Sequence, residues 1–300
     1  MCILKIKDLT KKYGDFEVLK GINLEINSPG IYALVGPNGA GKTTLFNIIS
    51  NLLNKSSGEI EVVGKKNTDE SIFYETSFLK DNNVLYDYLT GYDHLNFIKL
   101  TQKLSNDRVE EVVKKLQIES YMNKKVGEYS LGMKQHLLIA LAMLNKPKLM
   151  ILDEPLNGLD PTAIIKVRHL FKELVNSGTA ILISSHTLSE IDKLTNHIMF
   201  LKDGKIVSES LDYSNDNMYY LELEDIPNLG LEKIIFEDIE WTIDENRIKV
   251  NLKSKSINDL LKLLIDNDIR IVDIEKVKKG SEEKYIEMFP DEMDKIKGYV

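Results

Sequence analysis

An apolar run and a stretch with helical spacing flank an eight-residue motif, Gly36-Pro37-Asn38-Gly39-Ala40-Gly41-Lys42-Thr43. The spacing is G-x-x-x-x-G-K-T, and the flanking runs, Ile31–Val35 and Thr43–Leu53, predict a strand before the motif and a helix after it. Glycines let the backbone wrap a chain of phosphates, so that successive N–H groups and the helix N-terminus point at negative charge. The motif therefore predicts a site for a nucleoside triphosphate.

Each residue of this loop has a predicted part in binding. Lys42 is placed to reach the β and γ phosphates, and the Thr43 hydroxyl to bind a magnesium ion. The loop residues that we expect to contact the nucleotide are Gly36, Pro37, Asn38, Gly39, Ala40, Gly41, Lys42, Thr43 and Thr44.

Length and composition indicate a globular protein. The 300 residues suggest about two domains, and an apolar fraction of 43% with a charged fraction of 29% is not that of a disordered chain. No run approaches the ~18 apolar residues of a membrane span, and Lys5, Lys7 and Asp8 interrupt the N-terminus where a secretory signal would be apolar. The single cysteine, Cys2, excludes an intramolecular disulfide and fits a reducing compartment. We therefore expect a cytoplasmic protein, with any membrane role exerted through a partner.

The acidic charge belongs to the last third of the chain. From residue 211 onward there are 13 Lys and Arg against 22 Asp and Glu, out of totals of 39 and 47. The first 210 residues therefore carry a net charge of +1 and the remainder −9. Because phosphate backbones recruit basic surfaces, this balance argues against nucleic-acid binding in the C-terminal part.

Alternating strand-like and helical segments predict an α/β fold with a partly parallel sheet. Buried-strand runs are expected at Lys148–Leu152 and Thr179–Ser184, with a helix at Pro161–Asn176 between them. Helical spacing over about residues 86–145 indicates an inserted helical subdomain. Strand-like runs beyond residue 212, Ile234–Phe236 among them, and two helical stretches predict a small α+β domain. The expected domains are residues 1–212 and 213–300.

A pair of carboxylates narrows the chemistry, because a phosphate loop alone fits kinases, GTPases, helicases and transporters. The apolar run Leu149–Leu152 ends in Asp153 and Glu154. At the end of a strand in the same α/β segment, Asp153 is placed to hold magnesium, and Glu154 to polarise an attacking water as a general base.

The segment Ser130-Leu131-Gly132-Met133-Lys134-Gln135 opens a predicted helix, and it resembles the Leu-Ser-Gly-Gly-Gln signature of the ATP-binding cassette (ABC) superfamily. This version is similar to the variant found in bacterial exporters of the bacitracin, lantibiotic and multidrug type. The resemblance implies a P-loop NTPase (RecA-like) core with an antiparallel β subdomain and the helical insertion. Ser130 and Gly132, at a helix N-terminus, suit contact with a γ-phosphate.

Other elements of the family follow in order. By resemblance, Tyr13 stacks on adenine, Gln135 completes the signature, and Asp160 helps to join two cassettes. His186, after a predicted buried strand, matches the switch histidine that contacts the γ-phosphate. We expect Glu154 and His186 to be the catalytic residues.

Two positions depart from the family pattern. Asp81 stands where Gln or Glu is usual in the loop that reaches magnesium and the membrane partner, so the expected metal ligands are Thr43, Asp81 and Asp153. His136 follows the signature where Arg or Gln is usual.

The resemblance implies the ATP-binding and hydrolysing subunit of a bacterial ABC membrane transporter, with ATP and Mg²⁺ as cofactors. It is expected to export an antimicrobial peptide, a drug or a similar amphiphile. One phosphate loop and one signature per chain imply a dimer, with a second copy or a related chain, and separate integral-membrane permease subunits at the inner face of the cell membrane. The alternatives are a cassette ATPase acting on nucleic acid or ribosomes, a regulatory module that binds ATP without turnover, a phosphoryl-transfer kinase, and an importer.

Overall fold

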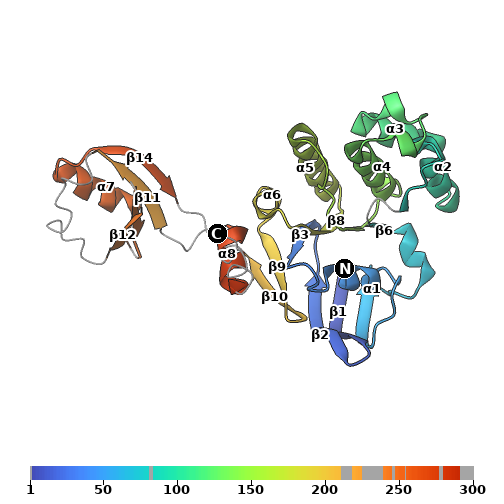
Figure 1. Cartoon of the computed structure of the whole chain (residues 1–300), viewed down its shortest axis with the longest axis horizontal. Coiled ribbons are helices and arrows are strands. Elements are labelled where there is room, and N and C mark those ends of the chain that lie inside the picture. Colours follow the sequence, from blue (N-terminus) through green and yellow to red (C-terminus); the bar gives the residue numbers. More distant parts are fainter. Residues whose placement is uncertain are drawn as a thin grey trace. The chain divides into compact units, whose positions relative to one another are not determined.

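The chain forms two units, shown in the computed structural model (Figure 1). The structure describes residues 2–80, 84–210, 218–224, 239–244, 247–253, 255–276 and 280–290. The core unit comprises residues 1–210 together with the segment that begins at Tyr285, and the accessory unit is Leu211–Lys284. The core unit thus ends close to the expected boundary at residue 212, but it also takes in the C-terminal segment that the sequence assigned to the second domain.

A six-stranded sheet organises the core unit, with strand order β10-β9-β3-β8-β7-β6. The strands from β9 to β6 are parallel, and β10 runs antiparallel to β9. Every residue of β7 and β8 is buried, which explains why their sequences are continuously apolar up to Ser184, the last residue of β8. The six strands are β3 (Gly30–Val35), β6 (Thr76–Leu79), β7 (Leu149–Leu152), β8 (Ala180–Ser184), β9 (His197–Lys202) and β10 (Lys205–Ser210).

A second, antiparallel sheet with order β2-β1-β4-β5 packs on the first. Its strands are β1 (Leu4–Tyr13), β2 (Phe16–Ile26), β4 (Ser57–Val62) and β5 (Lys65–Lys66). Helix α1 (Lys42–Ile49) contributes Leu45, Phe46 and Ile48 to a hydrophobic core that it shares with both sheets. In Figure 1 this sheet and α1 lie on one side of the six-stranded sheet, and helices α2–α5 lie on the other.

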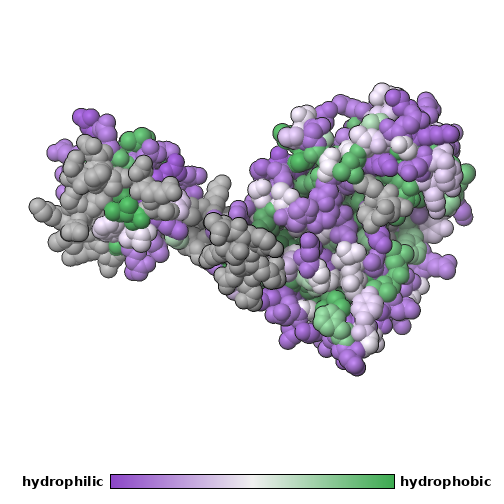
Figure 2. Space-filling model, viewed as in Figure 1, coloured by the Kyte–Doolittle hydropathy of each residue, from purple (hydrophilic) through white to green (hydrophobic). Residues whose placement is uncertain are grey.

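Helices α2 to α5 of the core unit begin at polar residues whose side chains cap them. The helices are α2 (Gly91–Thr101), α3 (Asn106–Leu116), α4 (Leu131–Met143), α5 (Pro161–Asn176) and α6 (Leu188–Asp192). Thr90 and Asp93 form a capping box at α2, and Ser105 caps α3. Helices α2 to α4 fall within residues 86–145, the range expected for the helical subdomain, and apolar residues appear among polar ones over this region in Figure 2.

The accessory unit is an antiparallel sheet with one described helix against it. The order is β12-β13-β11-β14, from β11 (Met218–Leu223), β12 (Glu240–Asp244), β13 (Arg247–Asn251) and β14 (Ile271–Lys276). Helix α7 (Ile257–Asp266) buries Leu260 and Leu264 in the core of this unit. A final helix, α8 (Ser281–Met288), leads into the C-terminal segment of the core unit. The strand expected at Ile234–Phe236 lies outside the described residues.

Candidate nucleotide site

The phosphate loop is closely packed between β3 and α1. Gly41, at the start of α1, has φ 104°, a left-handed conformation that favours glycine. A Cβ added at Gly41 would lie 2.9 Å from Val18 Cγ1, and one at Gly36 would lie 2.8 Å from the carbonyl oxygen of Leu201. The strands beneath the loop therefore leave no room for side chains at these two positions.

Lys42 is held over this loop. Its ammonium donates hydrogen bonds to the carbonyl oxygens of Gly36, at 2.6 Å, and Pro37, at 3.1 Å. Burial lowers the pKa of Lys42, and the nearby carboxylates of Glu154 and Asp153 oppose that shift. A partly desolvated cation at a helix N-terminus is well placed to meet phosphate oxygens.

A chain of hydrogen bonds joins α1 to the ends of β7 and β8. The Thr43 hydroxyl donates to Asp153 Oδ2 at 2.7 Å, and the Ser184 hydroxyl donates to Asp153 Oδ1 at 2.5 Å. Ser184 Oγ also accepts the backbone N–H of Glu154 at 3.0 Å. The Asp153 carboxylate is thereby held through both oxygens, Oδ2 at the start of α1 and Oδ1 at the end of β8.

Glu154 and His186 form a pair beside this network. Glu154 Oε2 lies 3.0 Å from His186 Nδ1 and accepts the His186 backbone N–H at 3.3 Å. The side chain of His186 is 61% exposed and that of Glu154 25%. Glu154 has φ 52°, the left-handed region that is costly for a non-glycine residue and that occurs often at functional sites. The pair thus presents a carboxylate and an imidazole at the rim of the site.

These residues surround a pocket of about 390 Å³, which we call the phosphate pocket. Eight of the predicted residues line it: Asn38, Gly39, Gly41, Lys42, Thr43, Thr44, Asp153 and Glu154. Asn157, three residues after Glu154, lines it as well. Residues that are 110 positions apart in the sequence, such as Thr43 and Asp153, therefore meet in one site.

The predicted signature residues do not line the phosphate pocket. Ser130 caps α4, where its hydroxyl accepts the Met133 N–H at 3.3 Å. Gly132 lies beside the loop after Glu154, since a Cβ on it would be 3.3 Å from the carbonyl oxygen of Gly158. Gln135 is buried and donates to the Pro155 carbonyl oxygen at 2.8 Å. Helix α4 is thus tied to the segment that follows Asp153 and Glu154.

Asp160 and Tyr13 also stand apart from the pocket lining. Asp160 caps α5 by accepting the Ala163 N–H at 2.9 Å. Tyr13, at the end of β1, is 51% exposed, with the Lys11 ammonium 4.8 Å from the centroid of its ring. Asp81 lies outside the described residues.

Sequence reasoning assigned no role to Ser184 or Asn157. The signal for Ser184 was present, because it ends a predicted buried strand parallel to the strand that ends before Asp153. Leu152 pairs with Ile183, so Asp153 and Ser184 follow side by side.

Comparison with known proteins identifies the family. Residues 19–157 match the family described as ABC transporter. The bacitracin transport ATP-binding protein BcrA of Bacillus licheniformis is 33% identical over 298 residues, covering 95% of this chain and 97% of that protein. The chain belongs to the ABC transporter ATP-binding proteins.

Two further matches extend this result. The lantibiotic transport ATP-binding protein SrtF of Streptococcus pyogenes is 37% identical over 216 residues, 72% of this chain and 94% of SrtF. The dimeric, post-hydrolysis structure of an ATP-binding cassette bound to ADP and Pi is 27% identical, with a TM-score of 0.64, covering 69% of this chain and 98% of that one. As an ABC protein, the chain is an ATPase and the ATP-binding subunit of a transporter. Such subunits dimerise and act with membrane permeases. Within the part of the chain that the structure describes, no helix is long and apolar enough to cross a bilayer.

Proposed function

We propose that the phosphate pocket binds the triphosphate of ATP and that its residues carry out hydrolysis. The positive-φ glycines expose backbone N–H groups, and Lys42 supplies the cation for the β and γ phosphates. The hydrogen-bonded group of Thr43, Asp153 and Ser184 at the end of the parallel strands is the observation that carries this proposal.

The same group fits Mg²⁺. Thr43 Oγ1 and the Asp153 carboxylate offer hard oxygen ligands within 2.7 Å of each other. Among the described residues, no group of three or more His, Cys, Asp or Glu side chains could hold a metal ion. This suits Mg²⁺, which is usually bound by one or two protein ligands with substrate phosphates and water completing its coordination. When bound there, the ion neutralises charge on the phosphates. Asp81 is proposed as a further ligand from its place in the sequence.

Glu154 is the proposed general base, which takes a proton from the attacking water as that water approaches the γ-phosphate. Its backbone N–H is held by Ser184, and its carboxylate contacts His186. We assign His186 the role of orienting the carboxylate and contacting the γ-phosphate.

A second ATPase subunit is proposed to complete the site, as a second copy or a related chain. Ser130, Gly132 and Asp160 stand outside the phosphate pocket of their own chain. Ser130 and Asp160 instead cap helix N-termini, which favour negative charge. Leu131 beside Ser130 is 52% exposed, as a residue at a subunit contact would be. We therefore infer that these residues face the nucleotide bound to a neighbouring subunit.

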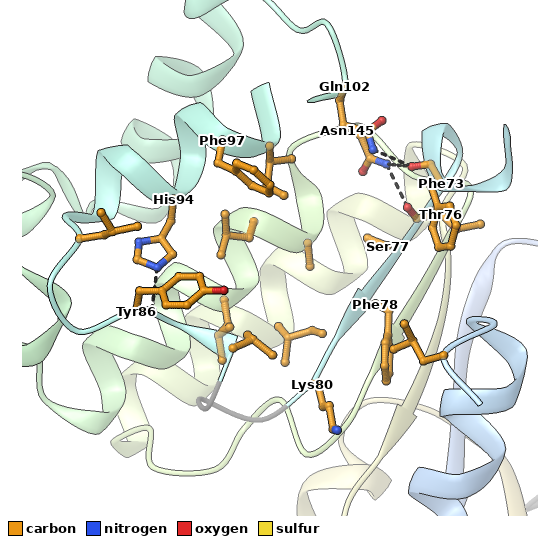
Figure 3. Close-up of a pocket in the computed structure, with 18 residues that line it drawn as sticks. Phe73, Thr76, Ser77, Phe78, Lys80, Tyr86, His94, Phe97, Gln102 and Asn145 are labelled. Carbon is orange, nitrogen blue, oxygen red and sulfur yellow. Dashed lines mark hydrogen bonds between the residues drawn. The ribbon is translucent and has the colours of Figure 1, made fainter. Parts of the chain in front are cut away.

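A pocket of about 580 Å³ between β6, α2 and α4 is proposed to receive a segment of the membrane permease (Figure 3). In Figure 3, His94 and Tyr86 lie at one end and Gln102 and Asn145 at the other. The lining is mostly apolar, but Ser77 Oγ and Gln102 Oε1 are buried polar atoms without a hydrogen-bond partner among the described residues. An apolar segment that carries a hydrogen-bond donor would satisfy both features.

The cargo is proposed to be an antimicrobial peptide, a drug or a similar amphiphile, moved outward. SrtF and BcrA, which are named for lantibiotic and bacitracin transport, support this proposal. Since ATP is cytosolic, we place the subunit in the cytoplasm, at the inner face of the cell membrane. Nucleic acid is not a proposed partner.

Glu154→Gln in the full chain tests the catalytic assignment. The amide keeps the shape of the carboxylate but cannot accept the proton, so turnover should fall about 100-fold to 10,000-fold. Sedimentation with MgATP should show a stable dimer, because ATP binds and is not hydrolysed. Glu110→Gln, on the exposed surface of α3, is the matched control. Unchanged hydrolysis in Glu154→Gln would exclude Glu154 as the base.

A further inference from the structure

The C-terminal segment Tyr285–Pro290 packs into the core unit. Phe289 is 7% exposed, and its ring centroid lies 6.4 Å from that of Phe200, on the fully buried strand position of β9. The centroid of the Tyr285 ring lies 4.7 Å from that of Phe289, and the Lys202 ammonium lies 6.0 Å from the Phe289 centroid. The aromatic contacts therefore anchor this segment on β9.

The anchored segment forms one wall of a second pocket, of about 450 Å³, which we call the C-terminal pocket. The other walls are the start of β2, the turn between β9 and β10, and the outer side of the phosphate loop. Its volume lies in the range of small-molecule sites, about 300–1,000 Å³. Met288 and Phe289 are the residues that the C-terminal segment contributes to the lining, together with Pro290.

The linings of the two pockets share Asn38 and Gly39, so the pockets are neighbours at the phosphate loop. Tyr13, which the family resemblance implies stacks on adenine, pairs with Phe16 at the β1–β2 hairpin, and Phe16 lines the C-terminal pocket. With the phosphates at Lys42, we therefore expect the nucleoside of ATP to lie toward this pocket.

We propose that Met288 and Phe289 form a wall for the nucleoside of ATP, and that the C-terminal segment sets the affinity of the site for nucleotide. This inference rests on the proposed phosphate pocket. The accessory unit lies between Ser210 and Tyr285 in the chain, so this wall follows it directly in sequence. The polypeptide chain therefore connects the accessory unit, and any ligand or partner bound to it, directly to the wall of the nucleotide site.

The test compares ATP with inorganic tripolyphosphate, which carries the phosphates without a nucleoside. Calorimetric titration of the full chain with each ligand, in the presence of Mg²⁺, distinguishes the contributions of the two pockets to affinity. Phe289→Ala should weaken ATP binding about threefold to tenfold and leave tripolyphosphate binding unchanged. Phe289→Tyr should restore most of the affinity, and Ile286→Ala, on the more exposed side of α8, is the control. KM for ATP should rise with little change in kcat.

A second variant keeps the test decisive if Phe289→Ala does not fold. Met288→Trp adds bulk to the half-buried wall and should obstruct ATP while sparing tripolyphosphate. Equal weakening of both ligands, or no weakening of ATP in either variant, would overturn the proposed wall. Lys42→Ala should weaken both ligands; if it weakens neither, the phosphate pocket itself is wrong, which is a separate failure.

Discussion

Ser184 donates a hydrogen bond of 2.5 Å to Asp153, and the two residues lie side by side at the ends of neighbouring parallel strands. The same hydroxyl accepts the backbone N–H of Glu154. One serine thus orients the proposed metal ligand and the residue proposed as the base. Ser184 is the last residue of β8, and Ser185 connects that strand to His186.

Ser184→Ala should therefore impair catalysis more than folding. Loss of the hydroxyl frees the Asp153 carboxylate and leaves the Glu154 N–H without its acceptor, so kcat should fall about tenfold to a hundredfold. Steady-state ATPase assays measure this, with Ser177→Ala, at the exposed end of α5, as the control. Full activity in Ser184→Ala would show that Asp153 needs no such orientation.

Gly41→Ala should abolish tight nucleotide binding. The new Cβ would approach Val18 to 2.9 Å, and the loop would have to move away from β2. Gly178 is a matched control, because its φ of 101° is nearly that of Gly41 but nothing lies within 4 Å of an added Cβ. Gly178→Ala should cost only backbone strain, about 1–2 kcal/mol, and leave ATP affinity unchanged. Equal ATP affinity in the two variants, measured by titration, would contradict the packing explanation.

Arg108→Ala should destabilise the core unit. The guanidinium donates to the carbonyl oxygens of Leu144, at 2.8 Å, and Met143, at 2.6 Å, at the end of α4. These carbonyls lack partners within the helix, so the loss should lower the free energy of unfolding by about 1.5–3 kcal/mol.

The single tryptophan, Trp241, separates this effect from the accessory unit, in which it lies. In urea, Arg108→Ala should shift the unfolding transition seen by far-UV circular dichroism and leave the Trp241 fluorescence transition in place. A shift of the fluorescence transition without a shift of the circular dichroism transition would contradict this prediction.

His136 should make stability depend on pH. Burial lowers the pKa of His136, the Lys166 ammonium adds to the shift, and the Asp160 carboxylate opposes it. The unfolded chain then binds more protons than the folded one, so stability is full above the unfolded value of 6.5 and is lost as the pH falls from there through the lowered folded pKa. In His136→Gln, the free energy of unfolding measured in urea should decrease less between about pH 7.5 and 5.5 than in the unaltered protein. The same slope in both proteins would exclude His136 as its source.

The fold elements with strong local signals were predicted well from the sequence. The α5 bounds, Pro161–Asn176, are the predicted ones, because Asp160 and Pro161 mark the helix start and the apolar spacing continues to the end. Strands β7 and β8 were each predicted to within one residue, since strands buried on both faces have continuous apolar sequences.

Within the six-stranded sheet, β6, β9 and β10 were not predicted. Strand β6 has four residues, of which only Leu79 is fully buried, so its position depends on pairing with the distant strand β7. The β9–β10 hairpin did carry a signal: Asp203 and Gly204, with φ 50° and 77°, form the Asp-Gly turn typical of hairpins.

The residue types of the site were predictable, whereas their assembly was not. Motif spacing and the family resemblance predicted roles for Lys42, Asp153, Glu154 and His186, but they could not show that Ser184 binds Asp153. Nor could it show that Phe289 packs on Phe200, because that contact joins segments separated by the accessory unit.

The return of the chain to the core unit at Tyr285 limits how the ATPase can be isolated. Truncation after residue 212 would remove Phe289 and uncover the side of Phe200 that it shields. Excision of residues 211–284 with a short artificial tether would instead retain the C-terminal helix turn. A minimal ATPase from this protein is therefore a two-piece fragment rather than an N-terminal one.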